Sequence, residues 1–323
     1  MKYLILTIKL TITFLLIYFA VRNIDYSQTK STLLSVDGVL VLGIGLTVVL
    51  IQTGIAGYKL IPILEIFNYQ IKVLDAIKLW FVGNFFSQIM ISFVGGDAMR
   101  LISLTRSGVE VKVAGRSILL DRVLGFVSLQ TLYLGAVFFL LKRLSEGPVY
   151  WGLLILASIN IIMILGFVCM GYIPQRLIGL NYVGKIFDFV AVSRFLFTSK
   201  IKVLYVLLMS CIVQLLNVIA MYLIAILLGA SISFFEAFIV GVPVMLFSML
   251  PISIGGWGVR ENSMIIGFNI IGISTEIALS VSIILGISLL IGSLPGAVIF
   301  WTKAGFFTDI RKNRNVAEIV YPL

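Results

Sequence analysis

The sequence predicts an all-α polytopic membrane protein, with about six transmembrane helices and two re-entrant helical hairpins in an inverted internal repeat. Hydrophobic residues make up 60% of the 323 residues and charged residues 12%, whereas charged residues make up about a quarter of a soluble domain. The apolar runs are continuous rather than alternating, which favours helices over a membrane barrel. A glycine-containing motif occurs in each half of the chain, at 91–100 and 252–260, which indicates the repeat.

The first half, residues 1–145, is expected to hold three spans and one hairpin. Its first two apolar runs are long enough to cross a bilayer, which needs about 20 helical residues. No small-residue cleavage site follows the first run, so we expect a retained span rather than a signal peptide. The run at 76–94 carries Asn84, Ser87 and Gln88, and we expect it to form the first arm of the hairpin. The expected elements are spans at 3–21 and 36–56, a re-entrant hairpin at 76–107 and a span at 117–141.

The second half, residues 146–303, repeats this order with a more sharply broken hairpin. The segment Pro251–Glu261 contains a proline, three glycines and an Arg-Glu pair, and it separates the apolar runs 236–250 and 262–273. Each run is too short to cross a bilayer as one helix, because about 20 residues are needed. Non-helical backbone inside a membrane must be surrounded by protein or by a water-filled cavity, so this segment predicts a polar pocket. The expected elements are spans at 149–171 and 203–228, a re-entrant hairpin at 236–273, a span at 276–302 and a cytoplasmic tail at 304–323.

The orientation follows from the repeated motif and from the basic residues. In both copies a Gly-Gly pair is followed four residues later by an arginine. Each half crosses the membrane three times, an odd number, so the second copy must be inverted. With the N-terminus inside, most basic residues fall in inside segments, including a loop with Lys59, and the outside loops hold Arg22, Lys30, Lys142 and Arg143. We therefore expect an inner (plasma) membrane protein with cytoplasmic termini; seven or eight plain spans are the alternative.

Composition narrows the range of partners. The net charge is +10, but the basic residues lie in short loops between apolar runs, so we expect no nucleic-acid partner. The chain has no histidine, and Cys169 and Cys211 both lie in apolar runs. Neither a disulfide framework nor a histidine-based metal site is therefore expected. The sequence has no nucleotide-binding motif, so we expect no cofactor and no ATP-driven step within the chain.

Ionisable residues inside apolar segments are the first candidates for a functional site. Each costs about 2.5–3.5 kcal/mol near the bilayer centre, so several of them need pairing or water. Ser210, Gln214 and Asn217 are spaced i, i+4 and i+7, which places them on one face of a span. The candidate substrate-binding residues are Asp97, Arg100, Asp121, Arg122, Arg260 and Glu261, with Gly95, Gly96, Gly255 and Gly256 in the repeated motifs and Gln214 and Asn217 on the polar face.

Structural roles remain open for the same residues. Arg100 is also compatible with an ordinary arginine that snorkels from a helix end. The adjacent Arg260 and Glu261 could form a local pair that satisfies a broken helix, and an Asp-Arg pair at the start of a span could be an ion pair that caps it. The polar face is also typical of hydrogen bonding between helices, and Gly-Gly pairs also permit turns and close packing.

The motifs resemble the flippase-like membrane domain of lysylphosphatidylglycerol synthases and of the stand-alone proteins related to it. The resemblance rests on Gly95-Gly96-Asp97 with Arg100, on Asp121-Arg122 after a basic stretch, and on Pro251–Glu261. The chain departs from the family pattern twice, because no proline precedes the first glycine pair and Asp121 stands where family members have glutamate. The 323 residues contain no aminoacyl-transfer domain, so we expect no synthesis of lysylphosphatidylglycerol. The resemblance implies lipid translocation, or handling of a lipid-linked intermediate.

These observations predict a transporter or flippase for an anionic or lipid-linked substrate, of the phospholipid or polyprenyl-phosphate type. Guanidinium groups suit phosphate, so we expect the headgroup to pass between Arg100 in the inside half and Arg260 in the outside half. The carboxylates would balance the empty cavity, and a proton or sodium ion is a possible coupling ion. The alternatives are an intramembrane lipid-modifying enzyme, such as a lipid-linked glycosyl transferase with Asp97 or Asp121 as base, and an accessory subunit of such an enzyme. The headgroup, the direction of transport and the oligomeric state stay open.

Overall fold

The structure is a computed structural model that describes residues 38–90, 94–172, 198–249, 256–302 and 310–312, together with residues 11, 18, 190 and 193–195. The predicted first span at 3–21, except two of its residues, lies outside the described residues. So do most of the predicted tail at 304–323, residue 250 and the stretch 251–255 of the broken segment.

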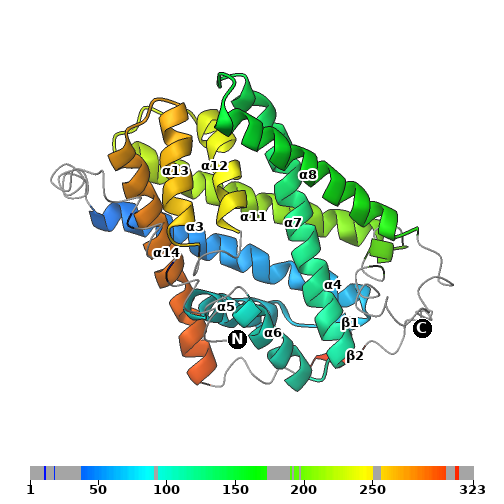
Figure 1. Cartoon of the computed structure of the whole chain (residues 1–323). Helices are drawn as coiled ribbons and strands as arrows, with labels where there is room; N and C mark the ends of the chain where they lie inside the picture. The colour runs from blue at the N-terminus through cyan, green and yellow to red at the C-terminus, as the bar shows by residue number, and fades with distance from the viewer. Residues whose placement is uncertain are drawn as a thin grey trace.

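The described chain is helical apart from one short pair of strands, which confirms the all-α prediction (Figure 1). Five helical segments are long and apolar enough to cross a membrane: α3 together with α4, then α7, α8, α11 and α14. The chain is therefore a polytopic membrane protein. In order, the elements are α3 (Gly38–Tyr58), α4 (Leu60–Ile66), β1 (Tyr69–Gln70), α5 (Val73–Ile89), α6 (Val94–Arg106), α7 (Val111–Leu141), α8 (Pro148–Met170), α11 (Lys200–Leu227), α12 (Phe234–Ser248), α13 (Val259–Ile270), α14 (Thr275–Trp301) and β2 (Arg311–Lys312).

The helix ends carry ordinary sequence features. Pro148 occupies the first turn of α8, where its missing N–H costs nothing. Ser233 begins α12 with a capping box, in which its Oγ accepts a bond from the Glu236 N–H and the Glu236 carboxylate accepts one from the Ser233 N–H. The tail returns to the start of the fold, because β2 pairs with β1 and Ile310 N donates to the carbonyl of Ser107 at 3.2 Å.

One predicted boundary was wrong in a way that matters for the site. Helix α7 begins at Val111 rather than at 117, because Lys112 and Arg116 interrupt the apolar pattern but not the helix. Asp121 and Arg122 therefore lie about 15 Å along α7, at 1.5 Å per residue, and not in its first turn.

Two pairs of short helices lie where the hairpins are predicted. Helices α5 and α6 have 17 and 13 residues, and α12 and α13 have 15 and 12 residues. All four are shorter than the roughly 20 residues that a crossing needs. The members of each pair pack against each other. In Figure 1, α5 and α6 lie on one side of α3 and α11, and α12 and α13 lie on the other.

Helix packing in the two halves follows one pattern. Helix α5 packs against α14, as α12 packs against α7. Helix α3 packs against α5 and α14, as α11 packs against α12 and α7. The helices α3 and α11 also contact each other, and α6 contacts α7 as α13 contacts α14. Exchanging α3 with α11, α5 with α12, α6 with α13 and α7 with α14 therefore reproduces these contacts.

Small residues allow these helices to approach closely, as is common in membranes. At Gly296 of α14, a Cβ atom would collide with the backbone carbonyl of Phe81 in α5. At Gly292 and Gly57, a Cβ atom would press on Val49 and on the backbone of Ile77. The contact between α5 and α14 depends on Gly296 in particular, because a backbone carbonyl cannot turn aside as a flexible side chain can.

We expect Gly296→Ala to destabilise the protein by about 1–3 kcal/mol, the usual cost of overpacking a close contact. The measurement is the free energy of unfolding of the purified protein in detergent. Gly135→Ala on α7 is the matched control, because a Cβ there would meet no atom within 4 Å. Equal stability of the two variants would contradict the close approach of α5 and α14.

Candidate functional site: two arginine centres inside the helix bundle

The first arginine centre consists of Asp97, Arg100 and Arg122, with Lys59 and Asp121 beside them. Arg122 donates two hydrogen bonds to Asp97, from Nε to Oδ2 and from Nη2 to Oδ1, both of 2.8 Å. Arg100 Nη1 donates to the same Oδ1 at 3.2 Å. Two-pronged guanidinium–carboxylate contacts of this kind are strong and directional. One carboxylate of α6 therefore binds two guanidinium groups, one from α6 and one from α7.

Helix α5 shapes the pocket around Arg100, which is only 6% exposed. Its guanidinium stacks on the Trp80 ring, 3.8 Å from the ring centroid, and Nη2 donates to Asn84 Oδ1 at 3.0 Å. Gly83 supplies the space, because a Cβ atom there would collide with Arg100 Nε. Gly96 of the repeated motif is also buried against α5, next to the carbonyl of Gly83. Arg100 is therefore not a snorkelling surface residue.

Lys59 was expected in a loop, and this expectation was wrong. It lies at the junction of α3 and α4, is 4% exposed, and places Nζ 2.7 Å from Asp121 Oδ1. Its Nζ also donates to Ser210 Oγ of α11 at 3.1 Å. Asp121 Oδ1 has no hydrogen bond of regular geometry, so its contact with Lys59 is ionic. This pair ties α7 to the α3–α4 junction and to α11.

The first centre carries an excess of positive charge. Lys59, Arg100 and Arg122 contribute three positive charges, and Asp97 and Asp121 contribute two negative ones, which leaves a net charge of +1. Arg122 is the accessible member, with 36% of its side chain exposed. An anion that reached Arg122 would find a surplus positive charge in a place with little water to screen it.

The second arginine centre consists of Arg260, Glu261 and Ser282. Arg260 Nη2 donates to Glu261 Oε1 at 2.8 Å and Arg260 Nε to Ser282 Oγ at 3.1 Å, while Ser282 Oγ donates to Glu261 Oε1 at 3.0 Å. The other Glu261 oxygen accepts a bond from the N–H of Gly258, at the start of α13. Arg260 and Glu261 are both buried. The positive charge of Arg260 and the negative charge of Glu261 cancel, so the second centre has no net charge.

The two centres share a construction. In each, an arginine follows a motif glycine by four residues, and its guanidinium faces a tryptophan ring, Trp80 for Arg100 and Trp257 for Arg260. In each, a glycine on a neighbouring helix makes room for the guanidinium, and Gly286 of α14 has this role for Arg260. Gly256 and Gly258 have φ angles of 79° and 84°, which favour glycine. The repeated motif thus builds the same kind of arginine pocket twice.

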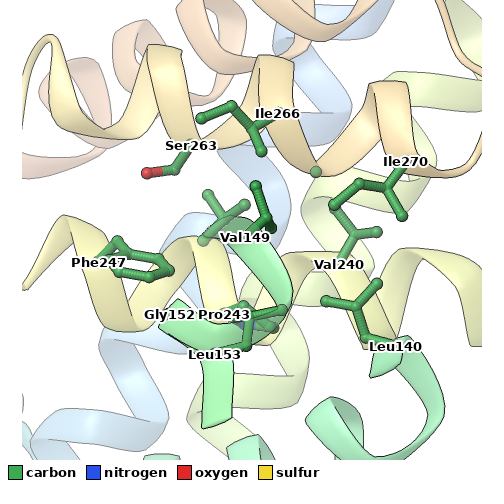
Figure 2. Close-up of a pocket in the computed structure, with 12 residues that line it drawn as sticks. Leu140, Val149, Gly152, Leu153, Val240, Pro243, Phe247, Ser263, Ile266 and Ile270 are labelled. Atoms are coloured by element: carbon green, nitrogen blue, oxygen red, sulfur yellow. The ribbon is translucent and has the colours of Figure 1, made fainter. Parts of the chain in front are cut away.

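Three cavities in the described part of the chain bear on the site, and two of them border the first arginine centre. One of about 160 Å³ lies between α3, α5, α11 and α14, and Trp80 and Asn84 of the first centre line it. One of about 10 Å³, the size of a single water, lies between Arg100 and Asp121. The third, of about 340 Å³, is apolar and lies between α12, α13 and the region where α7 ends and α8 begins (Figure 2).

The predicted polar face of α11 divides between two environments. Ser210 is buried and bonded to Lys59. Gln214 and Asn217 are half-buried, and Asn217 Nδ2 donates back to the carbonyl of Val213 at 3.4 Å. Neither Gln214 nor Asn217 is among the residues that line the three described cavities.

The two glycine pairs are described to different extents. Gly95 is half-buried, and a Cβ atom there would press on the side chain of Met90. Gly255 lies outside the described residues.

Sequence reasoning missed several residues of the centres. Lys59 could have been found as a charge inside the apolar stretch that forms α3 and α4, which together are long enough to span. Asn84 was predicted to lie in the first arm of the hairpin, but nothing in the sequence connects it with Arg100. Trp80 and Ser282 were missed because their role depends on the packing of a neighbouring helix against the arginine. Trp257 lies within the broken segment, but its contact with Arg260 was not predicted.

We expect Lys59→Met and Asp121→Leu each to cost about 3–5 kcal/mol of stability, because each leaves a buried charge without its partner. The double variant should recover most of this loss, because it buries no charge. The measurement is a double-mutant cycle on the free energy of unfolding in detergent. Lys202→Met, which breaks an exposed pair with Glu65, should change stability by less than about 1 kcal/mol. A double variant that is less stable than either single variant would contradict the buried pair.

Comparison with known proteins gives one family. Residues 6–296 match the lysylphosphatidylglycerol synthase transmembrane region. No curated protein matches the chain. The match covers both arginine centres and all the described helices up to the last turns of α14. The chain therefore belongs to the family of the lysylphosphatidylglycerol synthase transmembrane region.

Proposed function

We propose that this protein carries an anionic or lipid-linked substrate between the leaflets of its membrane, with the headgroup passing between the two arginine centres. The observation that carries the proposal is the repeated pocket, in which an arginine four residues after a motif glycine is buried within a pair of short helices. Ionisable groups inside membrane proteins are costly and usually functional. The family supports a relation to lipid metabolism or lipid translocation.

In this proposal α5–α6 and α12–α13 are re-entrant hairpins of an inverted repeat. The first hairpin belongs to the half 1–145 and the second to the half 146–303. The α12 helix of 15 residues is about 22 Å long at 1.5 Å per residue, less than the roughly 30 Å of hydrocarbon. The matching helix contacts in the two halves support the repeat. The burial of Gly96, in the first turn of α6, and of Gly256, in the turn before α13, supports helix breaks that lie within protein, as unpaired backbone in a membrane requires.

The proposal further places the protein in the inner (plasma) membrane with both termini cytoplasmic. The return of the tail to Ser107, at the end of α6, supports a tail on the same side as the turn between α6 and α7. That turn is part of the basic inside segment in the predicted orientation.

The first centre is suited to exchange ligands with an arriving anion. Arg122 is half-exposed and held by Asp97, so a phosphate can replace the carboxylate on its fork without moving Arg100. Asp97 then stays paired with Arg100, and the surplus positive charge of the centre is neutralised by the substrate. When the anion leaves, Arg122 returns to Asp97, so the empty site does not retain the ligand. A proton or sodium ion that coupled transport to a gradient would act on Asp97, Asp121 or Glu261.

The apolar cavity gives the hydrocarbon part of the substrate a separate place. It is lined by Val240, Pro243 and Phe247 of α12 and by Ile266 and Ile270 of α13 (Figure 2). Ile266 is exposed, so the cavity can exchange with the surrounding lipid. A chain in this cavity would stay in an apolar environment while the headgroup moves through the polar interior.

We expect Arg100→Gln and Arg260→Gln each to slow the transfer of anionic lipid at least about tenfold, because each removes charge-assisted bonds worth about 1.5–3 kcal/mol. The measurement is transfer of a fluorescent anionic phospholipid between the leaflets of sealed proteoliposomes. Arg143→Gln is the matched control, since Arg143 forms an exposed pair with Glu236 away from both centres. Normal transfer by both centre variants would overturn the proposal. Conversion of the lipid by detergent-solubilised protein would point to an enzyme instead.

Glycine variants leave the charge of each arginine in place and test its position instead. Gly83→Ala and Gly286→Ala should also slow transfer, because each new methyl group collides with the guanidinium of Arg100 or of Arg260. Gly125→Ala on α7 is the control, because its Cβ would meet nothing within 4 Å. If a centre variant unfolds, its glycine partner still tests the same arginine.

A further inference from the structure

We infer that the 160 Å³ cavity beside the first arginine centre binds an uncharged headgroup rich in hydroxyl groups, of the sugar or cyclic-polyol class, carried on the phosphate of the lipid. The inference rests on the proposed function and adds the chemical class of its substrate. The polar residues that line the cavity are Gln52 and Thr53 of α3, Asn84 and Gln88 of α5, and Ser293 of α14.

Three carboxamides face this cavity with hydrogen-bonding groups to spare. No described residue forms a hydrogen bond with the side chains of Gln52 or Gln88, and both are half-buried. Asn84 Oδ1 accepts a bond from Arg100, which leaves its NH₂ group for the cavity. Each free carboxamide offers two donor hydrogens and acceptor lone pairs. All three side chains are half-buried, so these groups remain open to a ligand that enters the cavity.

The two hydroxyl groups supply acceptors. Thr53 Oγ1 donates to the carbonyl of Val49 at 2.8 Å, and Ser293 Oγ donates to the carbonyl of Leu290 at 2.7 Å. Their protons are used, so their oxygens are left as acceptors. The cavity therefore offers donors and acceptors together, which is what a hydroxyl group needs because it is both.

The lining of the cavity carries no charge. The other lining residues are apolar: Val49, Ala56, Trp80, Val213, Leu289 and Gly292. An ammonium or carboxylate group placed here would lose its hydration without gaining a counter-charge, so charged headgroups are disfavoured. The cavity volume corresponds to roughly ten water-sized positions, which suits a single ring rather than a long oligosaccharide.

The cavity and the proposed phosphate site at the first centre share residues. Asn84 lines it and also bonds to Arg100, and Trp80 lines both this cavity and the small cavity that Arg100 and Asp121 border. Gln88 lies one helical turn beyond Asn84, about 6 Å along α5. A phosphate at the first centre would thus place the next group of the headgroup against the three carboxamides.

The test uses sealed proteoliposomes and three fluorescent lipids: phosphatidylinositol, with a cyclic polyol; phosphatidylserine, with charged groups; and phosphatidic acid, with phosphate alone. We expect the wild-type protein to transfer phosphatidylinositol at least about tenfold faster than the other two. The double variant Gln52→Met/Gln88→Met should remove this preference and leave the rate for phosphatidic acid unchanged. Gln130→Met is the matched control, because Gln130 is buried in α7 and lines none of the three cavities.

The outcomes separate the inference from the proposed function. Equal wild-type rates for the three lipids, or an unchanged preference in the double variant, would overturn the inference and leave the transporter intact. If the wild-type protein transfers none of them, binding of short-chain versions of the lipids to the protein in detergent decides. Tighter binding of phosphatidylinositol that the Gln52→Met single variant weakens supports the inference, and equal binding of all three overturns it.

Discussion

A guanidinium group buried in a membrane protein must be neutralised and hydrogen-bonded where it lies, and the architecture of this protein depends on that constraint. Arg100 is satisfied by Asp97, Asn84 and the face of Trp80, and Arg260 by Glu261 and Ser282. The partners of Arg100 come from α5 and α6, so Arg100 joins these two short helices to each other, and Arg122 joins them to α7 through Asp97. Arg260 is joined to α14 through Ser282. The glycines beside the guanidinium groups, Gly83 and Gly286, follow from the need for space, and those in the turn before α13 follow from its positive φ angles.

The two centres differ in charge although they are built alike. The first has a surplus positive charge and an accessible Arg122, whereas the second is a neutral, closed triad of Arg260, Glu261 and Ser282. In the proposed cycle the first centre would hold the substrate more tightly in this conformation, and the second would open only when its internal ion pair exchanged with the headgroup. An inverted repeat can reach the opposite arrangement by exchanging the conformations of its halves.

The sequence was sufficient for features that depend on local pattern. The spans predicted from residue 36 onward and the short helices of the two predicted hairpins follow from apolar runs and glycines, and the structure has helices at those places. The sequence was not sufficient where a charged residue lies within a helix or the protein interior and not in a loop, as its polarity suggests. Lys112 and Arg116 hid the true start of α7, so Asp121 was placed too close to a helix end. Lys59 looked like one of many basic loop residues, because the helix α11 that receives it is 151 positions away along the chain at Ser210. The 160 Å³ cavity is formed by side chains of α3 and α5 together, and neither apolar run alone reveals it.

The central claim is that the two short-helix pairs enter the membrane from opposite faces and bring their arginines toward each other. Labelling of single cysteines by a membrane-impermeant reagent tests it most directly, in a variant with Cys169 and Cys211 replaced by serine. Glu110→Cys marks the turn after α6, and Ser231→Cys marks the turn before α12; both positions are exposed. The account predicts that in oriented membrane vesicles the two cysteines are labelled from opposite sides. Labelling of both from the same side would contradict it.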